Sequence, residues 1–157
     1  MVPFGLSTEQ FSMKFLRSLD KIAPNFIEEL KSLFLLPVPE TVSEAEVQIF
    51  LGDDGMETPS AWIYFHGKNN KVDSSDPTIF PGKSREILHG SYDIPPFDEE
   101  YYFDEDFGGV YLIANITKRW LAECWWKAGG WEYPIPVKVW VHDEFGDGSS
   151  IDLSKLC

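Results

Sequence analysis

Six carboxylates flank three consecutive aromatic residues between positions 98 and 106, and no other stretch of the chain is better suited to do chemistry. Carboxylates this close repel one another unless a cation or a basic side chain neutralises them. Aromatic side chains are common anchors of protein interfaces. The segment therefore indicates contact with a positively charged partner, whereas the alternative is a solvated loop whose acids face a helix dipole.

One tryptophan joins this predicted contact. Helical geometry turns successive side chains about 100 degrees apart, so Trp126 lies off the apolar stripe that carries Trp125. The predicted partner-binding residues are Asp98, Glu99, Glu100, Tyr101, Tyr102, Asp104, Glu105, Asp106 and Trp126.

The other tryptophans leave two interpretations open. Trp120 and Trp125 repeat with apolar neighbours at helical spacing, which favours the core. Trp131 follows two glycines and Trp140 shares a strand face with polar residues, so we expect both to be partly exposed. Large rings are frequent in cores and interfaces alike. The group is therefore either core packing, or an interface or sugar-stacking platform.

No residue set has the spacing of a catalytic, metal or cofactor site. The three histidines fall on separate expected elements, and none lies one helical turn from another as paired zinc ligands would. Cys124 lies on an apolar helical stripe, which favours a core thiol over a nucleophile. The sequence also lacks a glycine-rich phosphate loop, a serine elbow and a complete calcium loop. We therefore predict no catalytic residue, no metal and no cofactor.

The charge balance is strongly acidic, with 26 Asp and Glu against 13 Lys and Arg and a net charge of −13. Nucleic acid and anionic membranes bind through lysines and arginines, so neither is an expected partner. A basic protein is attracted instead, at a rate that falls as salt rises. The alternative is that the acidity serves solubility alone.

The cysteine count and the first residues favour the cytoplasm. Only two cysteines occur, and the chain does not begin with a basic region followed by an apolar run. No stretch approaches the roughly 18 apolar residues that cross a bilayer.

Apolar residues at spacings of three and four predict two helical regions. The first starts at Ser7 in the capping box "STEQ" and resumes after Pro24, which has no amide hydrogen to donate. We therefore expect a break or kink and a helical pair over about 7–36. The second region ends at Gly129, a residue type that often terminates helices in the left-handed conformation.

Alternating apolar and polar residues predict the strands. Longer strands are expected over 44–51, 60–66 and 135–141, and shorter ones within 84–90 and around 151–153. Most of 67–107 lacks periodicity and is predicted to be a long irregular acidic loop. These elements favour a single α+β domain spanning 1–157, in which an antiparallel sheet of about four to five strands is covered by two to three helices.

Together these features favour a non-catalytic acidic binding protein that neutralises a basic protein partner, such as an immunity protein or an inhibitor of a nuclease-like toxin. Two alternatives stay open. A small hydrolase, or a domain that binds carbohydrate or another small molecule, would need a tryptophan-lined cleft with paired carboxylates. A module that associates with itself would place the acidic segment at its own interface.

Overall fold

Two helices and five strands make up the described part of the chain. Their bounds are Thr8–Leu35 (α1), Val42–Phe50 (β1), Ser60–Gly67 (β2), Ser84–Leu88 (β3), Gly109–Lys127 (α2), Val137–Val141 (β4) and Ile151–Asp152 (β5), with a 3-10 turn η4 at Gly130–Glu132. The computed structural model describes residues 7–38, 40, 42–51, 58–67, 84–89, 109–142 and 148–154. Most of the predicted acidic loop therefore lies outside the described residues.

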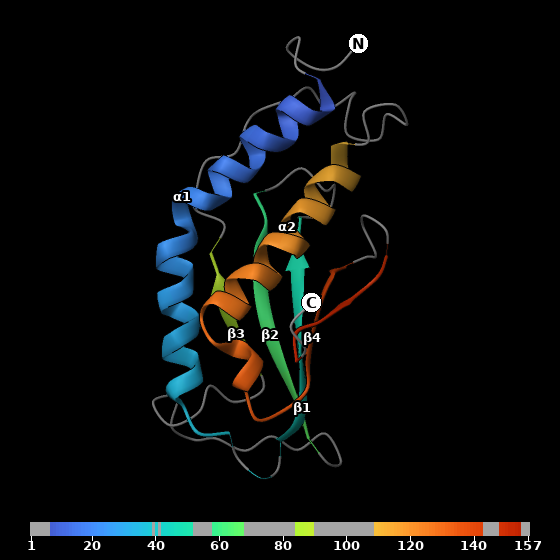
Figure 1. Cartoon of the computed structure of the whole chain (residues 1–157). Coiled ribbons are helices and arrows are strands. Elements are labelled where there is room, and N and C mark those ends of the chain that lie inside the picture. Colours follow the sequence, from blue (N-terminus) through green and yellow to red (C-terminus); the bar gives the residue numbers. More distant parts are fainter. Residues whose placement is uncertain are drawn as a thin grey trace.

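Helix α1 begins where the capping box predicts. The Ser7 hydroxyl accepts a hydrogen bond from the backbone N–H of Gln10 at 3.1 Å, and the Gln10 side chain accepts one from the Ser7 N–H at 2.9 Å. Figure 1 shows the helix changing direction near its middle. Pro24 lies inside this helix, and a proline there removes one backbone hydrogen bond and bends the helix. The bend agrees with the prediction, but the expected helical pair is one continuous helix, because its apolar stripe packs on the same core on both sides of the proline.

The five strands form one mixed sheet in the order β3-β2-β1-β4-β5. Strand β1 pairs antiparallel with β2, as do β2 with β3 and β4 with β5, whereas β1 and β4 run parallel. Helix α2 connects β3 to β4, and a helical crossover of this kind returns the chain so that the next strand runs parallel. The predicted α+β class and strand number are confirmed, and the expected purely antiparallel sheet is corrected at the β1–β4 pair.

Both helices cover the same face of the sheet (Figure 1). The covered face carries alternate side chains of β1, β2 and β4, each at most 4% exposed: Ala45, Val47, Ile49, Ala61, Ile63, Phe65, Val137, Val139 and Val141. Full burial of a large aliphatic or aromatic side chain is worth about 1.5–3 kcal/mol, so this layer is the main stabilising contact of the fold. The remaining side chains of the same strands are directed to the opposite face.

Three rings close the core where α2 gives way to η4. The buried Trp125 ring lies edge-on to Phe34 at 4.7 Å and to Tyr133 at 5.7 Å between ring centroids. Gly129 has φ of 91°, a left-handed conformation that glycine adopts at little cost. Gly130 lies so close to Trp125 that an added Cβ would meet the ring at 2.3 Å. The two glycines therefore serve different needs, a backbone turn and close packing.

Helix α2 also carries a buried charged side chain. Lys118 is 3% exposed, and its Nζ donates to the backbone oxygen of Ser149 at 2.9 Å and to the Ser149 hydroxyl at 3.1 Å. A buried ammonium is costly unless it is hydrogen-bonded. These bonds fasten the segment before β5 to the helix layer.

Candidate functional site

The sheet face opposite the helices carries unexpectedly large side chains. We call this surface the open face and define it by Glu44, Glu46, Gln48, Phe50, Trp62, Tyr64, His66, Lys138, Trp140 and His142. All of these residues are half-buried or exposed. The free face of an antiparallel sheet is usually polar. Here four of the ten residues are phenylalanine, tryptophan or tyrosine, side chains that contribute large apolar area to cores and interfaces alike.

Strand pairing arranges the open face in rows. Glu46 of β1 lies between Tyr64 of β2 and Lys138 of β4, and the next row places Gln48 between two tryptophans. The row at Glu46 depends on the parallel β1–β4 pair, because a different register would bring other residues beside it.

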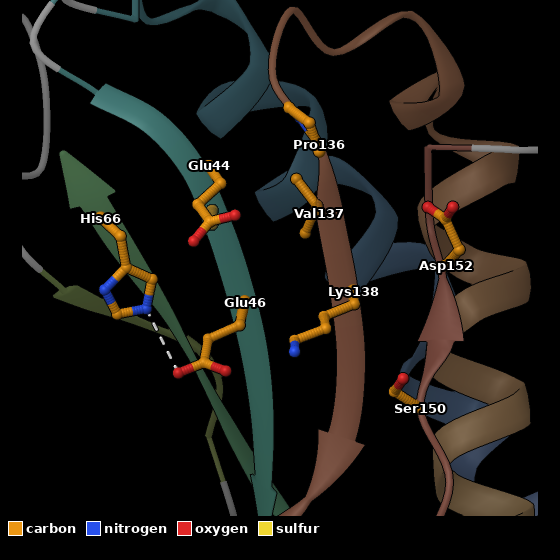
Figure 2. A pocket seen from close by; sticks show the side chains of 9 residues that line it. Glu44, Glu46, His66, Pro136, Val137, Lys138, Ser150 and Asp152 are labelled. Atoms are coloured by element: carbon orange, nitrogen blue, oxygen red, sulfur yellow. Dashed lines mark hydrogen bonds and ion pairs between the residues drawn. The ribbon is translucent and has the colours of Figure 1, made fainter. Parts of the chain in front are cut away.

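Glu46 is the centre of a hydrogen-bond network on the open face. Trp140 Nε1 donates to Glu46 Oε2 at 2.9 Å, and Gln48 Nε2 donates to Oε1 at 3.1 Å. His66 Nε2 lies 3.3 Å from the same Oε1, the contact drawn in Figure 2. The Glu46 side chain is 18% exposed. The carboxylate is therefore held in one orientation by side chains from three neighbouring strands.

These contacts also keep Glu46 ionised. Burial raises the pKa of Glu46, but hydrogen bonds from Trp140, Gln48 and His66, together with the charge interaction with His66, outweigh it, so the pKa lies below its ordinary value. Burial and the nearby Glu46 charge raise the pKa of Tyr64. Glu46 is thus a fixed negative charge at neutral pH, and Tyr64 beside it is a neutral phenol.

A second contact extends the network along β1. His142 Nδ1 lies 3.1 Å from Gln48 Oε1, and the His142 ring lies 4.7 Å from the Phe50 ring between centroids. Gln48 thus bonds to Glu46 through its amide nitrogen and contacts His142 through its oxygen. One connected set of polar contacts therefore joins Glu46, Gln48, Trp140, His66 and His142.

A groove of about 330 Å³ opens beside Glu46 (Figure 2). It is lined by Glu44, Ala45, Glu46, His66, Pro136, Val137, Lys138, Ser150 and Asp152, and so crosses from β2 to β5. Three carboxylates and one lysine give the lining a net charge of −2 when His66 is neutral. The groove therefore attracts cations.

The lysine in the groove does not neutralise its acids. Lys138 lies beside Glu46 on one side and Asp152 on the other in the strand register. Among the described residues, however, neither Lys138 nor Glu44 takes part in a salt bridge. The anionic end of the groove is consequently left without a cation from a described lysine or arginine.

Two further hollows lie at the helix layer. One of about 290 Å³ lies between α1 and β3 and is lined by Ile22, Asn25, Phe26, Glu29, Ile87, Leu88 and His89. The other, of about 600 Å³, lies where α1 ends beside η4, and Phe34, Leu35 and Tyr133 are among its lining residues. Among the described contacts, neither of these two linings contains a carboxylate held by several side-chain hydrogen bonds, as Glu46 is in the groove.

The predicted partner-binding residues are mostly not placed. Asp98, Glu99, Glu100, Tyr101, Tyr102, Asp104, Glu105 and Asp106 all lie outside the described residues. Trp126 is described: it is half-buried against the core, and its indole N–H donates to the backbone oxygen of Leu153 at 3.1 Å. Its role in partner binding stays a prediction.

The other tryptophans divide as the sequence indicates. Trp120 and Trp125 are 3% and 0% exposed and belong to the core, whereas Trp131 is 52% exposed. Trp140 is half-buried, and its indole N–H is directed to Glu46. Trp120 and Trp125 therefore belong to the core packing, and Trp140 belongs to the open face.

Cys124 and the described histidines and carboxylates are the residues that bear on nucleophilic and metal chemistry. Cys124 is 2% exposed, and burial raises the pKa of its thiol to about 12, which keeps it protonated. No group of three or more histidine, cysteine, aspartate or glutamate side chains in the described ranges is arranged to hold a metal ion. What the open face offers instead is an oriented carboxylate among aromatic rings.

Sequence reasoning missed Glu46, Gln48 and Trp62 as candidate site residues. It found the alternation that directs them to one face, but Glu46 and Trp140 are 94 residues apart and meet only through the β1–β4 pair. The available signal was the aromatic and acidic composition of the polar-side positions in three expected strands.

Neither described helix is long and apolar enough to cross a membrane. Comparison of the chain with protein-family models finds no matching family, and comparisons with curated proteins and with solved structures find no significant match either.

Proposed function

We propose that this chain is a non-catalytic acidic binding protein that neutralises a basic protein partner, as an immunity protein or an inhibitor of a nuclease-like toxin does. The observation that carries the proposal is the open face, where large rings surround a fixed, ionised Glu46 on a surface that the described helices leave free. Proteins that mask basic sites need carboxylates for attraction and aromatic rings for anchorage.

The rings support a protein partner. Trp62 and Tyr64 alternate along β2 on the open face, and both are half-buried. Rigid aromatic side chains supply large contact area at low cost in conformational entropy, which is why they are enriched at interface hot spots. Their position on strands rather than loops holds them ready for contact without rearrangement.

The charges support a basic partner. The net charge of −13 favours encounter with a positively charged protein, and the groove places part of that negative charge on the open face. The acidic segment 98–106 remains a predicted contributor to the same interface. Cytoplasmic location also remains a proposal.

The small-molecule alternative would require a tryptophan-lined cleft. None of the three hollows described above has a tryptophan in its lining. The ring-bearing surface is the open face itself, which favours a macromolecular partner over a small ligand.

The test begins with capture of basic proteins from the source cells, followed by purification of each candidate and calorimetric titration at low and high salt. Tyr64→Ala and Trp62→Ala should each weaken binding about tenfold or more, as removal of interface aromatics commonly does. Tyr111→Ala is the matched control, because Tyr111 is 50% exposed on α2, away from the open face.

A purified nuclease partner adds an inhibition assay. The wild-type protein should block its activity at equimolar concentration, and the open-face variants should need a higher concentration. The proposal is overturned by affinity that does not change with salt, or by equal effects of Tyr64→Ala and Tyr111→Ala on binding.

A further inference from the structure

We propose that the groove beside Glu46 receives an arginine side chain of the basic partner, with the guanidinium against Glu46 and Glu44. This inference rests on the proposed function and adds the chemical identity of the group that enters the groove. It is carried by the juxtaposition of a hollow, an oriented carboxylate and, on the same strand, a second carboxylate that has no salt bridge with a described residue.

Glu46 is prepared for a cation before any partner arrives. Three side chains already fix its carboxylate through contacts of 2.9 to 3.3 Å. A carboxylate has about four lone-pair sites, so these contacts leave room for at least one further donor. Because the orientation is already set, little conformational entropy is lost when that donor binds.

The chain does not complete this site with its own described cations. Glu46 is 18% exposed, and its only ion-pair contact among the described residues is with His66, which carries charge only when protonated. Glu44 has no salt bridge with a described residue, and Lys138 on the neighbouring strand bonds to neither glutamate. A half-buried, ionised carboxylate gains more from an incoming cation than a solvated one does.

Arginine fits this site better than the other cations. A metal ion would need several converging ligands, and no three histidine, cysteine, aspartate or glutamate side chains among the described residues are arranged to hold one. A guanidinium presents five donors in one plane, so it can bond to two carboxylates at once. It is also more weakly hydrated than an ammonium, so its desolvation in the groove costs less. The groove volume of about 330 Å³ suits one long side chain and its adjoining backbone rather than a whole element.

Lys138 limits where in the groove the guanidinium can lie. It lies on β4, and Figure 2 shows its side chain extending toward Glu46. Its positive charge repels a guanidinium, which is therefore confined to the side of Glu46 that faces Glu44 and His66. Removal of this charge should strengthen arginine binding, whereas removal of either glutamate charge should weaken it.

The probe is N-acetyl-arginine amide, titrated into the full chain and followed by two-dimensional NMR. The indole N–H of Trp140 donates to Glu46, so its resonance reports directly on the occupied site. We expect a saturable shift of that resonance with the arginine probe, a weaker effect with N-acetyl-lysine amide, and none with the neutral isostere N-acetyl-citrulline amide.

Variants test the residues. Glu46→Gln should weaken the arginine probe about tenfold or more, the usual scale for a charge-assisted hydrogen bond. Glu44→Gln provides a second variant if the first loses structure, since Glu44 is exposed and forms no described salt bridge. Lys138→Gln should tighten binding. Glu132→Gln, an exposed acid on η4, is the matched control and should leave affinity unchanged.

Equal shifts with arginine and citrulline would overturn the assignment, as would equal affinity for lysine or equal weakening by Glu132→Gln. Absence of any shift at Trp140 would also overturn it. These failures are separable from failure of the proposed function: loss of partner binding in Trp62→Ala with no response to arginine would reject the groove occupant alone. A response to arginine without any basic protein partner would reject the function instead.

Discussion

The hydrogen bond from Trp140 to Glu46 gives the sharpest test of the open face. Trp140→Phe keeps an aromatic ring on β4 and removes the indole N–H that lies 2.9 Å from Glu46 Oε2. A hydrogen bond to a charged group contributes about 1.5–3 kcal/mol, and partial exposure of the pair reduces this, so we expect the variant to be about 1–2 kcal/mol less stable near neutral pH.

The pH dependence separates this bond from simple loss of packing. The folded-state pKa of Glu46 is lowered below its ordinary value of 4.5, so its contribution to stability is present above that value and is lost as pH falls through the folded-state pKa. Removal of a donor lets the pKa rise toward its ordinary value. The difference in free energy of unfolding between wild type and Trp140→Phe should therefore be largest at about pH 7 and should decrease toward about pH 3.

Urea unfolding followed by far-ultraviolet circular dichroism at several pH values measures this gap. Trp131→Phe is the matched control, because Trp131 is 52% exposed and should show a gap near zero at every pH. A gap for Trp140→Phe that is the same at neutral and acid pH would refute the reasoning, since lost ring packing does not titrate.

Two further predictions concern the core. Gly130→Ala should destabilise the fold by about 1–3 kcal/mol through overpacking, because the new Cβ would meet the Trp125 ring at 2.3 Å. Gly129→Ala has open space around the new Cβ, but the φ of 91° at this position should make it about 1–2 kcal/mol less stable, the cost of a left-handed backbone. Asparagine adopts this backbone more readily than alanine, so in thermal unfolding Gly129→Asn should be more stable than Gly129→Ala, whereas Gly130→Asn should be no more stable than Gly130→Ala. In a Cys157→Ser background, Cys124 should react with a maleimide only as fast as the protein unfolds, since burial raises its thiol pKa to about 12; rapid labelling of the folded protein, monitored by mass spectrometry, would contradict its place in the core.

Local patterns in the sequence determined the elements and their inward faces. The capping box at Ser7 fixed the start of α1, because its hydrogen bonds join residues three apart. Alternation in β1 and β4 assigned Val47 and Val139 to the core, since successive strand side chains point to opposite faces. The same alternation directed Glu46 and Trp140 outward, but it could not tell that they would touch.

Tertiary structure alone decided what meets on the open face. The crossover through α2 inserts β4 parallel to β1, and this pairing joins residues 94 positions apart in the chain. Tertiary packing also decided that the residues before and after Pro24 form one bent helix, because both halves contact a common core. Short-range patterns follow from backbone geometry within one element, whereas the position of one strand beside another depends on packing across the whole sheet. The candidate site belongs to the second kind, since Glu46 becomes a fixed anion only when three strands bring their donors to it.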